Sequence, residues 1–289
     1  MANKVYQIVT DRVIALLERG VVPWRRPWAG ADVQPQNLVS RRPYRGVNPF
    51  LLACTGFASP YWVTFRQAKT LGGSVRKGEK STPVIFWKRW RTERIDRETG
   101  DRESVEIPIL RYYPVFNAEQ CDGIDVPELP KVHDFQPIER CESIVPGMAN
   151  PPQIEHREAR AYYRPTSDTI NMPRAELFVG PEAYYGTLYH ELSHSTGHSS
   201  RLNRQGITST AAFGSADYSR EELIAEMGAA FLCGHCGIES VTLDNSAAYL
   251  AGWLRRLRED HRLIVSAAAA AQRAADYILG TTFESSKSE

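Results

Sequence analysis

Apolar residues recur at intervals of three and four positions near both ends of this chain, which is the spacing of amphipathic helices. The first stretch predicts a helix over residues 4–19 that ends at Gly20. The last stretch, over 246–279, is rich in alanine and is also expected to be helical. The polar residues after Gly280 are expected to fray.

Further helices are predicted between these ends. In the first half, Thr64 is expected to cap a short helix that closes at Gly72-Gly73. In the second half, one helix starts at Gly180-Pro181 and carries an apolar stripe. Another covers 219–232, with Ser219 as its N-cap.

Segments rich in β-branched and aromatic residues predict strands between the helices. The strands 83–90 and 107–116 flank a charged turn around Gly100 and are expected to form a long hairpin. Shorter strands are expected over 159–163 and 168–172, on either side of a turn that contains proline.

A proline-rich stretch over 126–152, with one predicted helix at 138–145, separates the two halves of the chain. A chain of 289 residues has ample length for a core in each half. We therefore expect an α+β protein of two domains, residues 1–127 and 137–289, joined by a linker over 128–136.

The charge of the chain is divided unevenly, although its net charge is only +1. Residues 1–120 hold 20 Lys and Arg against 11 Asp and Glu, a net charge of +9, so the remainder carries −8. A basic front half joined to an acidic back half suggests that the front half binds a polyanion.

Aromatic residues are interleaved with the basic ones, and five of the six tryptophans lie in the front half. Single-stranded nucleic acid stacks its bases on aromatic rings while Lys and Arg contact phosphates, so this pairing predicts single-stranded DNA as a partner. The candidate DNA contacts are Trp24, Arg25, Arg26, Trp28, Arg41, Arg42, Tyr44, Arg45, Trp62, Arg66, Arg76, Lys77, Lys80, Trp87 and Lys88. In the alternative interpretation, the tryptophans belong to the core and the charges form a solvated face. Alternation along a strand would place one of Trp87 and Trp90 inward and the other outward.

The motif His190-Glu191-Leu192-Ser193-His194 indicates a metal site. On a helix, His190 and His194 lie on one face and can bind one Zn²⁺ or another divalent transition metal. Glu191 lies beside the metal, where it can act as a general base toward water. The competing interpretation is a surface helix with two unrelated histidines.

A third metal ligand is expected from the helix over 219–232. Glu222 and Glu226 share one face of it. We predict that Glu222 is the ligand and that Glu226 holds a ligand histidine through its second ring nitrogen, although the reverse order stays open. Glu221 is interpreted as an acidic, solvated residue of the first turn that favours the helix dipole.

A peptidase would also need a group that stabilises an oxyanion, and the sequence offers Tyr163, His198 and His261 without choosing among them. Ser200 stands where the metzincin pattern needs a third histidine, so that pattern fails. His198 is therefore expected to pack or to line the cleft.

The five cysteines are odd in number and irregularly spaced, and no signal segment follows Met1, so a reducing cytoplasm is expected. The C-x-x-C at Cys233 and Cys236 has no second cysteine pair and is interpreted as buried. No apolar run is long enough to suggest contact with a membrane.

Four stretches of the chain resemble ArdC-type antirestriction proteins, in this order: PYWVTFRQAKTLGGSVRKGEKSTPVIFW, AYYRPTSDTINMP, YYGTLYHELSHSTGHSSRLNR and SREELIAEMGAAFLC. The likeness extends from residue 3 to about residue 279. The N-terminal module of that family is also similar to a region of plasmid-type primases. The second half resembles the gluzincin branch of zinc metallopeptidases, in which a glutamate on a later helix completes H-E-x-x-H.

The resemblance implies a basic α+β domain that binds single-stranded DNA, followed by a mainly helical, zincin-like (gluzincin-type) domain with a small sheet. It further implies an antirestriction protein of a mobile element that protects incoming DNA from restriction enzymes. The alternative is an active metalloprotease that cleaves a host or partner protein and uses the DNA-binding half for targeting. Single-stranded DNA and a protein substrate or restriction enzyme are the partners to expect.

Overall fold

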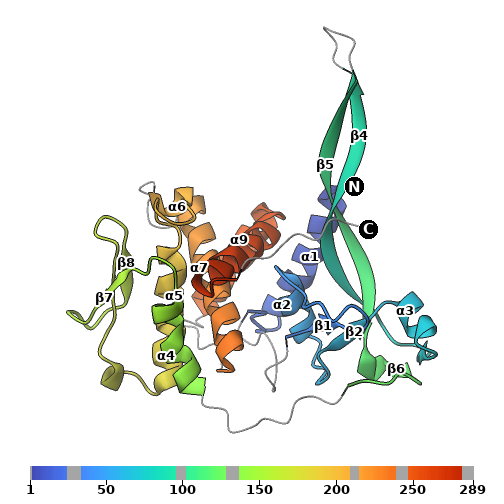
Figure 1. Cartoon of the computed structure of the whole chain (residues 1–289), viewed down its shortest axis with the longest axis horizontal. Coiled ribbons are helices and arrows are strands. Elements are labelled where there is room, and N and C mark those ends of the chain that lie inside the picture. Colours follow the sequence, from blue (N-terminus) through green and yellow to red (C-terminus); the bar gives the residue numbers. More distant parts are fainter. Residues whose placement is uncertain are drawn as a thin grey trace.

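The computed structural model describes residues 2–24, 34–95, 102–127, 137–208, 215–238 and 247–281. The fold is α+β with two domains, as predicted from the sequence, and Figure 1 shows a sheet with a long projecting hairpin beside a mainly helical part. The predicted linker over 128–136 and the tail after 281 lie outside the described residues.

The sheet of the first domain is dominated by a hairpin of β4 (Thr82–Ile95) and β5 (Arg102–Asn117). Every residue of β4 has an antiparallel partner on β5, so the predicted hairpin is confirmed and is longer than expected. β2 (Tyr61–Val63) pairs with β5, and β1 (Gln36–Asn37) pairs with β2. The far end of the hairpin extends away from the rest of the molecule (Figure 1).

Three helices and a second pair of strands lie beside the hairpin. They are α1 (Ala2–Leu17), α2 (Asn48–Ala53), α3 (Phe65–Thr70), and the strand pair β3 (Ser74–Val75) and β6 (Cys121–Asp122). The predicted cap at Thr64 is confirmed, because its hydroxyl accepts from the Gln67 amide while the Gln67 side chain accepts from the Thr64 amide. Asn48 pairs with the open edge of β4, where its amide group donates to the Ile85 carbonyl and accepts from the Ile85 N–H.

The second domain packs helices against a small sheet. The helices are α4 (Pro137–Gly147), α5 (Pro181–Ser195), α6 (Gln205–Thr208), α7 (Ala216–Cys236), α8 (Ala247–Glu259) and α9 (Leu263–Ile278). The two predicted strands are present as β8 (Tyr162–Arg164), which begins three residues later than predicted, and β9 (Thr169–Asn171). A third strand, β7 (Gln153–Glu155), was not predicted. β9 lies in the middle of this sheet.

One helix prediction needs correction and another gains detail. Ser215 caps α7, because its hydroxyl accepts from the Tyr218 amide, whereas Ser219 lies inside the helix and donates to the Ser215 carbonyl. The alanine-rich tail is helical, as predicted, and it divides into two helices. The break follows Asp260, whose carboxylate accepts from the Arg262 amide and so ends the first helix.

The largest buried cluster includes residues of both domains. Val9 and Val13 of α1 share it with Ile264 of α9, and Trp24 contacts Trp253 of α8 edge to face with ring centroids 6.2 Å apart. The apolar stripe of α1 was predicted, and it is covered both by β5 of its own domain and by α8 and α9 from the C-terminal end of the chain. The two domains are therefore joined by a common core.

Candidate metal centre and nucleic-acid interface

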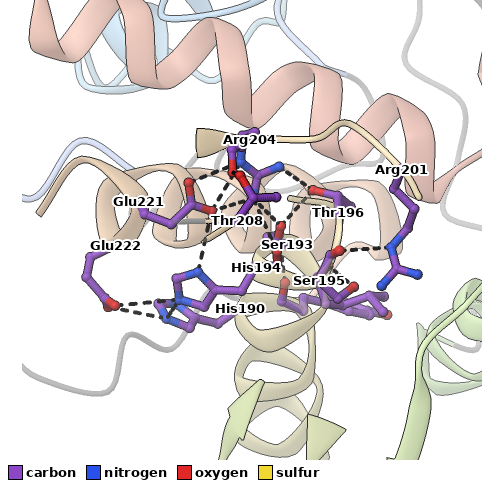
Figure 2. A network of polar contacts seen from close by, with 12 residues as sticks. His190, Ser193, His194, Ser195, Thr196, Arg201, Arg204, Thr208, Glu221 and Glu222 are labelled. Atoms are coloured by element: carbon purple, nitrogen blue, oxygen red, sulfur yellow. Dashed lines mark hydrogen bonds and ion pairs between the residues drawn. The ribbon is translucent and has the colours of Figure 1, made fainter. Parts of the chain in front are cut away.

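Helix α5 begins at Gly180-Pro181, as predicted, and brings His190 and His194 together on one face. Both imidazoles are buried, and their Nε2 atoms lie 3.1 Å apart (Figure 2). Two nitrogens of neighbouring turns that converge in this way can share one ion. The interpretation as two unrelated surface histidines is therefore wrong.

Helix α7 places Glu222 opposite this pair. Its two carboxylate oxygens lie 3.6 Å from His190 Nε2 and 3.6 Å from His194 Nε2. Ligand atoms of the three residues lie within 4.8 Å of one another. Two imidazole nitrogens and one carboxylate oxygen are the donor set of catalytic zinc sites that keep a fourth position open, so these residues fit a divalent cation.

Two more carboxylates act on His190 from nearby. Glu191 and Glu226 are both buried, and Glu226 is not part of the three-residue cluster. Burial lowers the pKa of His190, but the contact with Glu222 and the charges of Glu191 and Glu226 raise it to about 9. This concentration of negative charge beside the histidine pair favours a cation.

Glu221 was expected to be solvated, and the structure contradicts that prediction, because Glu221 is only 4% exposed. Its carboxylate accepts from Arg204 and lies 3.6 Å from His194 Nδ1, the nitrogen that faces away from the cluster (Figure 2). Burial raises the pKa of Glu221, but His194 and Arg204 outweigh it and hold the pKa below its ordinary value. Glu221 therefore carries a negative charge behind a candidate ligand.

Arg204 reaches Glu221 from the loop that follows α5. Its guanidinium also donates to the Ser193 carbonyl at 2.8 Å and to the Thr196 hydroxyl, so it ties the end of α5 to α7 (Figure 2). Gly197 permits this approach, since a Cβ there would lie 2.5 Å from the Ile207 side chain and 3.1 Å from Arg204.

Each of the three residues considered for oxyanion stabilisation has a hydrogen bond to a residue outside the metal cluster. The Tyr163 hydroxyl donates to Asp168, which is held in turn by Arg201. His198 Nδ1 is bonded to Ser200. The carbonyl of His261 accepts from Thr10, in the contact between the two domains.

Tyr218 is the phenol that sequence reasoning missed. It lies on α7 one turn before Glu222, and its side chain is hydrogen-bonded to that carboxylate. Burial and the charges of Glu222 and Glu191 raise the pKa of Tyr218 to about 12. Tyr218 therefore keeps its proton and can donate at the edge of the centre. The signal available in the sequence was that Tyr218 stands four residues before Glu222, which places both side chains on one face of the helix.

Three predicted DNA-stacking residues are corrected by the structure. Trp24, Trp62 and Tyr44 are buried, and each belongs to a hydrophobic cluster. Their rings contact other aromatic side chains instead of solvent, so bases cannot stack on them in this fold. For these three residues the interpretation as core aromatics holds.

Two predicted phosphate contacts are engaged within the protein. Arg45 is paired with Asp276 of α9, and Arg76 with Glu79 and Asp122. The remaining candidates in the described chain lie at the surface: Arg41, Arg42, Arg66, Lys77, Lys80, Trp87 and Lys88. Arg25, Arg26 and Trp28 lie outside the described residues.

The paired histidines on α5 and the glutamate on α7 define a class, that of the zincin-like metallopeptidases. Residues 140–270 match the family model of that domain, and residues 3–116 match the N-terminal domain of anti-restriction factor ArdC. The chain belongs to the ArdC family of antirestriction proteins.

The antirestriction ArdC protein from the R388 plasmid resembles the chain over almost its whole length. The metal-free crystal structure is 42% identical with a TM-score of 0.73, covering 94% of this chain and 96% of the other. The Mn(II)-bound structure is 40% identical with a TM-score of 0.72, covering 95% and 97%. That protein therefore binds a divalent metal.

Two relatives extend the comparison. The uncharacterized protein y4eC of Sinorhizobium fredii (strain NBRC 101917 / NGR234) is 35% identical, over 99% of this chain and 94% of its own length. The DNA primase TraC of Escherichia coli is 36% identical, but the match covers 95% of this chain and only 27% of the primase. None of the described helices is both long enough and apolar enough to span a membrane.

Proposed function

We propose that this protein protects DNA that enters a cell on a mobile element, and that it acts by binding single-stranded DNA with its N-terminal domain. The observation that carries the proposal is the alignment of nearly the whole chain with an antirestriction protein at 42% identity. The net charge of +9 over residues 1–120 supports it, because DNA binding depends on neutralised phosphates.

The second domain is proposed to hold Zn²⁺ through His190, His194 and Glu222, with another divalent metal such as Mn²⁺ as an alternative occupant. When bound, the metal would polarise a carbonyl group and increase the acidity of water. Glu191 follows a ligand directly and is buried beside it, so it can accept a proton from water and return it to a leaving amine. Glu226 adds negative charge near His190. Tyr218 can donate a hydrogen bond to an oxyanion.

A second candidate function is proteolysis of a host or partner protein, with the N-terminal domain serving to target the enzyme to DNA. The observation that favours it is Glu191, because a purely structural metal would not need a base in that position. We rank this function below DNA binding. Coating of the entering strand would protect it without any cleavage.

Binding of DNA by the purified full chain tests the proposal. We expect single-stranded oligonucleotides to bind more tightly than duplex, with little preference for sequence, and affinity to fall steeply as salt screens the phosphates. The full chain is used because α1 shares its core with α8 and α9. Equal affinity for single strands and duplex would argue against the proposal.

A further inference from the structure

The exposed aromatic side chains of the β4–β5 hairpin divide between its two faces. Residues paired across the hairpin lie on the same face, and neighbours along a strand lie on opposite faces. Phe86 is paired with Arg111, and Tyr113 is paired with Val84, two positions before Phe86. Phe86 and Tyr113 therefore share one face, while Trp87 and Tyr112 lie on the other.

The face that carries Trp87 and Tyr112 is partly covered by the protein itself. Ile85 and Leu110, on this face, are buried in the main cluster with α1. The Trp87 ring is 54% exposed, yet it makes an edge contact with Tyr6 of α1 at 6.5 Å between centroids. Trp87 therefore belongs to the contact between the β4–β5 hairpin and α1.

The face that carries Phe86 and Tyr113 has its aromatic rings turned to solvent. Phe86 is 45% exposed and Tyr113 is 38% exposed, and the two rings meet edge to face at 5.9 Å. The ring of the buried Tyr44 packs against Phe86, with the ring centroids 6.1 Å apart. These contacts hold the two exposed rings in position. A planar group that stacks on them therefore causes only a small loss of side-chain conformational entropy.

Two cations flank these rings on the same face. Arg111 lies across from Phe86, and Lys88 lies two positions further along β4. Both are exposed, and neither makes an ion pair with any residue in the described parts of the chain. Aromatic rings beside unpaired positive charges suit a ligand with flat apolar groups joined by anionic links.

We propose that Phe86, Tyr113, Lys88 and Arg111 form the surface on which single-stranded DNA binds; we call it the stacking face. The inference rests on the proposed DNA binding and specifies where it occurs. Bases of a single strand can stack on the two rings while phosphates contact the two cations. The paired bases of a duplex have no free faces to offer the rings. The inference adds Phe86 and Tyr113 as base-stacking residues, whereas Trp87, which lies on the other face, stays a prediction from the sequence.

Variants of the full chain test this surface by fluorescence anisotropy with a labelled oligothymidylate. Phe86→Leu and Tyr113→Leu preserve apolar volume but remove the aromatic face, and each should weaken binding about tenfold. Tyr112→Leu is the matched control, since its ring is as exposed but lies on the other face, and binding should change less than about twofold. Lys88→Ala and Arg111→Ala should each reduce the salt dependence of binding.

The results of these experiments distinguish a failure of the stacking face from a failure of the proposed function. If the wild-type chain does not bind single-stranded DNA, the proposed function fails and this surface with it. If the wild type binds while the Phe86 and Tyr113 variants bind equally well, only the surface is wrong. The same conclusion follows if the Tyr112 variant loses as much affinity as they do. Circular dichroism spectra that match wild type show that each variant is folded.

Discussion

At the metal centre, two charged side chains lie behind His194 and do not belong to the ligand cluster. Glu221 lies behind His194 Nδ1, and Arg204 holds the Glu221 carboxylate in place (Figure 2). A carboxylate behind a ligand histidine sets which ring nitrogen carries the proton and so leaves the other free for the metal. We therefore expect Arg204 to orient His194 through Glu221.

A graded series of zinc affinities follows from this arrangement. His190→Ala and His194→Ala remove ligand atoms, and the purified variants should lose bound metal, whereas Glu191→Ala should retain it. Glu221→Gln and Arg204→Met should each lower zinc affinity about 10–100-fold, because both weaken the orientation of His194. Isothermal titration calorimetry with zinc alone measures the series.

The double variant of Glu221 and Arg204 should lose no more affinity than either single variant if Arg204 acts through Glu221. Arg201→Met is a matched control. Arg201 is another buried arginine after α5, but it binds Asp168 and the Ser195 carbonyl. Arg201→Met should lower the free energy of unfolding and leave the zinc affinity unchanged. Unaltered affinity in Glu221→Gln would contradict the positioning role.

Local spacing made the histidine pair predictable, because four residues on a helix always return to the same face. Glu221 could not be predicted in this way. Its environment depends on Arg204, which is 17 residues away and arrives from a loop. Trp24 was misassigned for the same kind of reason, since its burial depends on Trp253 in the C-terminal part of the chain.

At the scale of elements, the metal centre depends on close packing of α5 against α7. Gly228 of α7 faces Ser193 of α5, which lies directly before His194, and a Cβ at Gly228 would be 2.4 Å from Ser193 Oγ. The Ser193 hydroxyl is buried and donates to the Tyr189 carbonyl, so it has little room to move. The absence of a side chain at Gly228 allows the two ligand helices to approach.

Gly228→Ala is therefore expected to destabilise the protein by about 1–3 kcal/mol, the usual range for overpacking in a core. The control is Gly252→Ala within α8, where an added Cβ meets nothing within 4 Å. That variant should gain about 0.5–1 kcal/mol from helix propensity. Urea unfolding monitored by circular dichroism measures both, and a Gly228 variant as stable as wild type would refute the packing argument.

The periodicity of apolar residues predicted the helices α5 and α7 and the long β4–β5 hairpin, because amphipathic spacing and strand alternation are local properties of the sequence. It did not locate the start of α7, where Ser215 and Ser219 are both plausible caps and only the backbone shows which hydroxyl is used. It also missed β7, which is three residues long and pairs in parallel with β9.

At the scale of the whole molecule, the core that α1 shares with α8 and α9 couples the two domains. We expect thermal unfolding of the full chain to be one transition, followed equally by tryptophan fluorescence and far-ultraviolet circular dichroism. Five of the six tryptophans belong to the N-terminal half, so fluorescence reports mainly on that half. Adding zinc should raise the midpoint seen by both signals, since ligands stabilise the state that binds them.

Two separate transitions, with zinc moving only one of them, would contradict the coupling. His190→Ala is the control, because its midpoint should not respond to zinc. The coupling also means that a fragment ending at residue 127 would expose the apolar face of α1, so functional tests belong on the full chain.

The survival of unmodified plasmid DNA entering a restricting cell is the most direct test of how the protein acts. Cells would carry wild type, Glu191→Ala, or the double variant Phe86→Leu with Tyr113→Leu, at equal protein levels. We predict that Glu191→Ala keeps most of the protection and that the double variant loses it, because protection depends on binding the strand. Loss of protection in Glu191→Ala, with zinc and DNA binding unchanged, would contradict this account and indicate proteolysis.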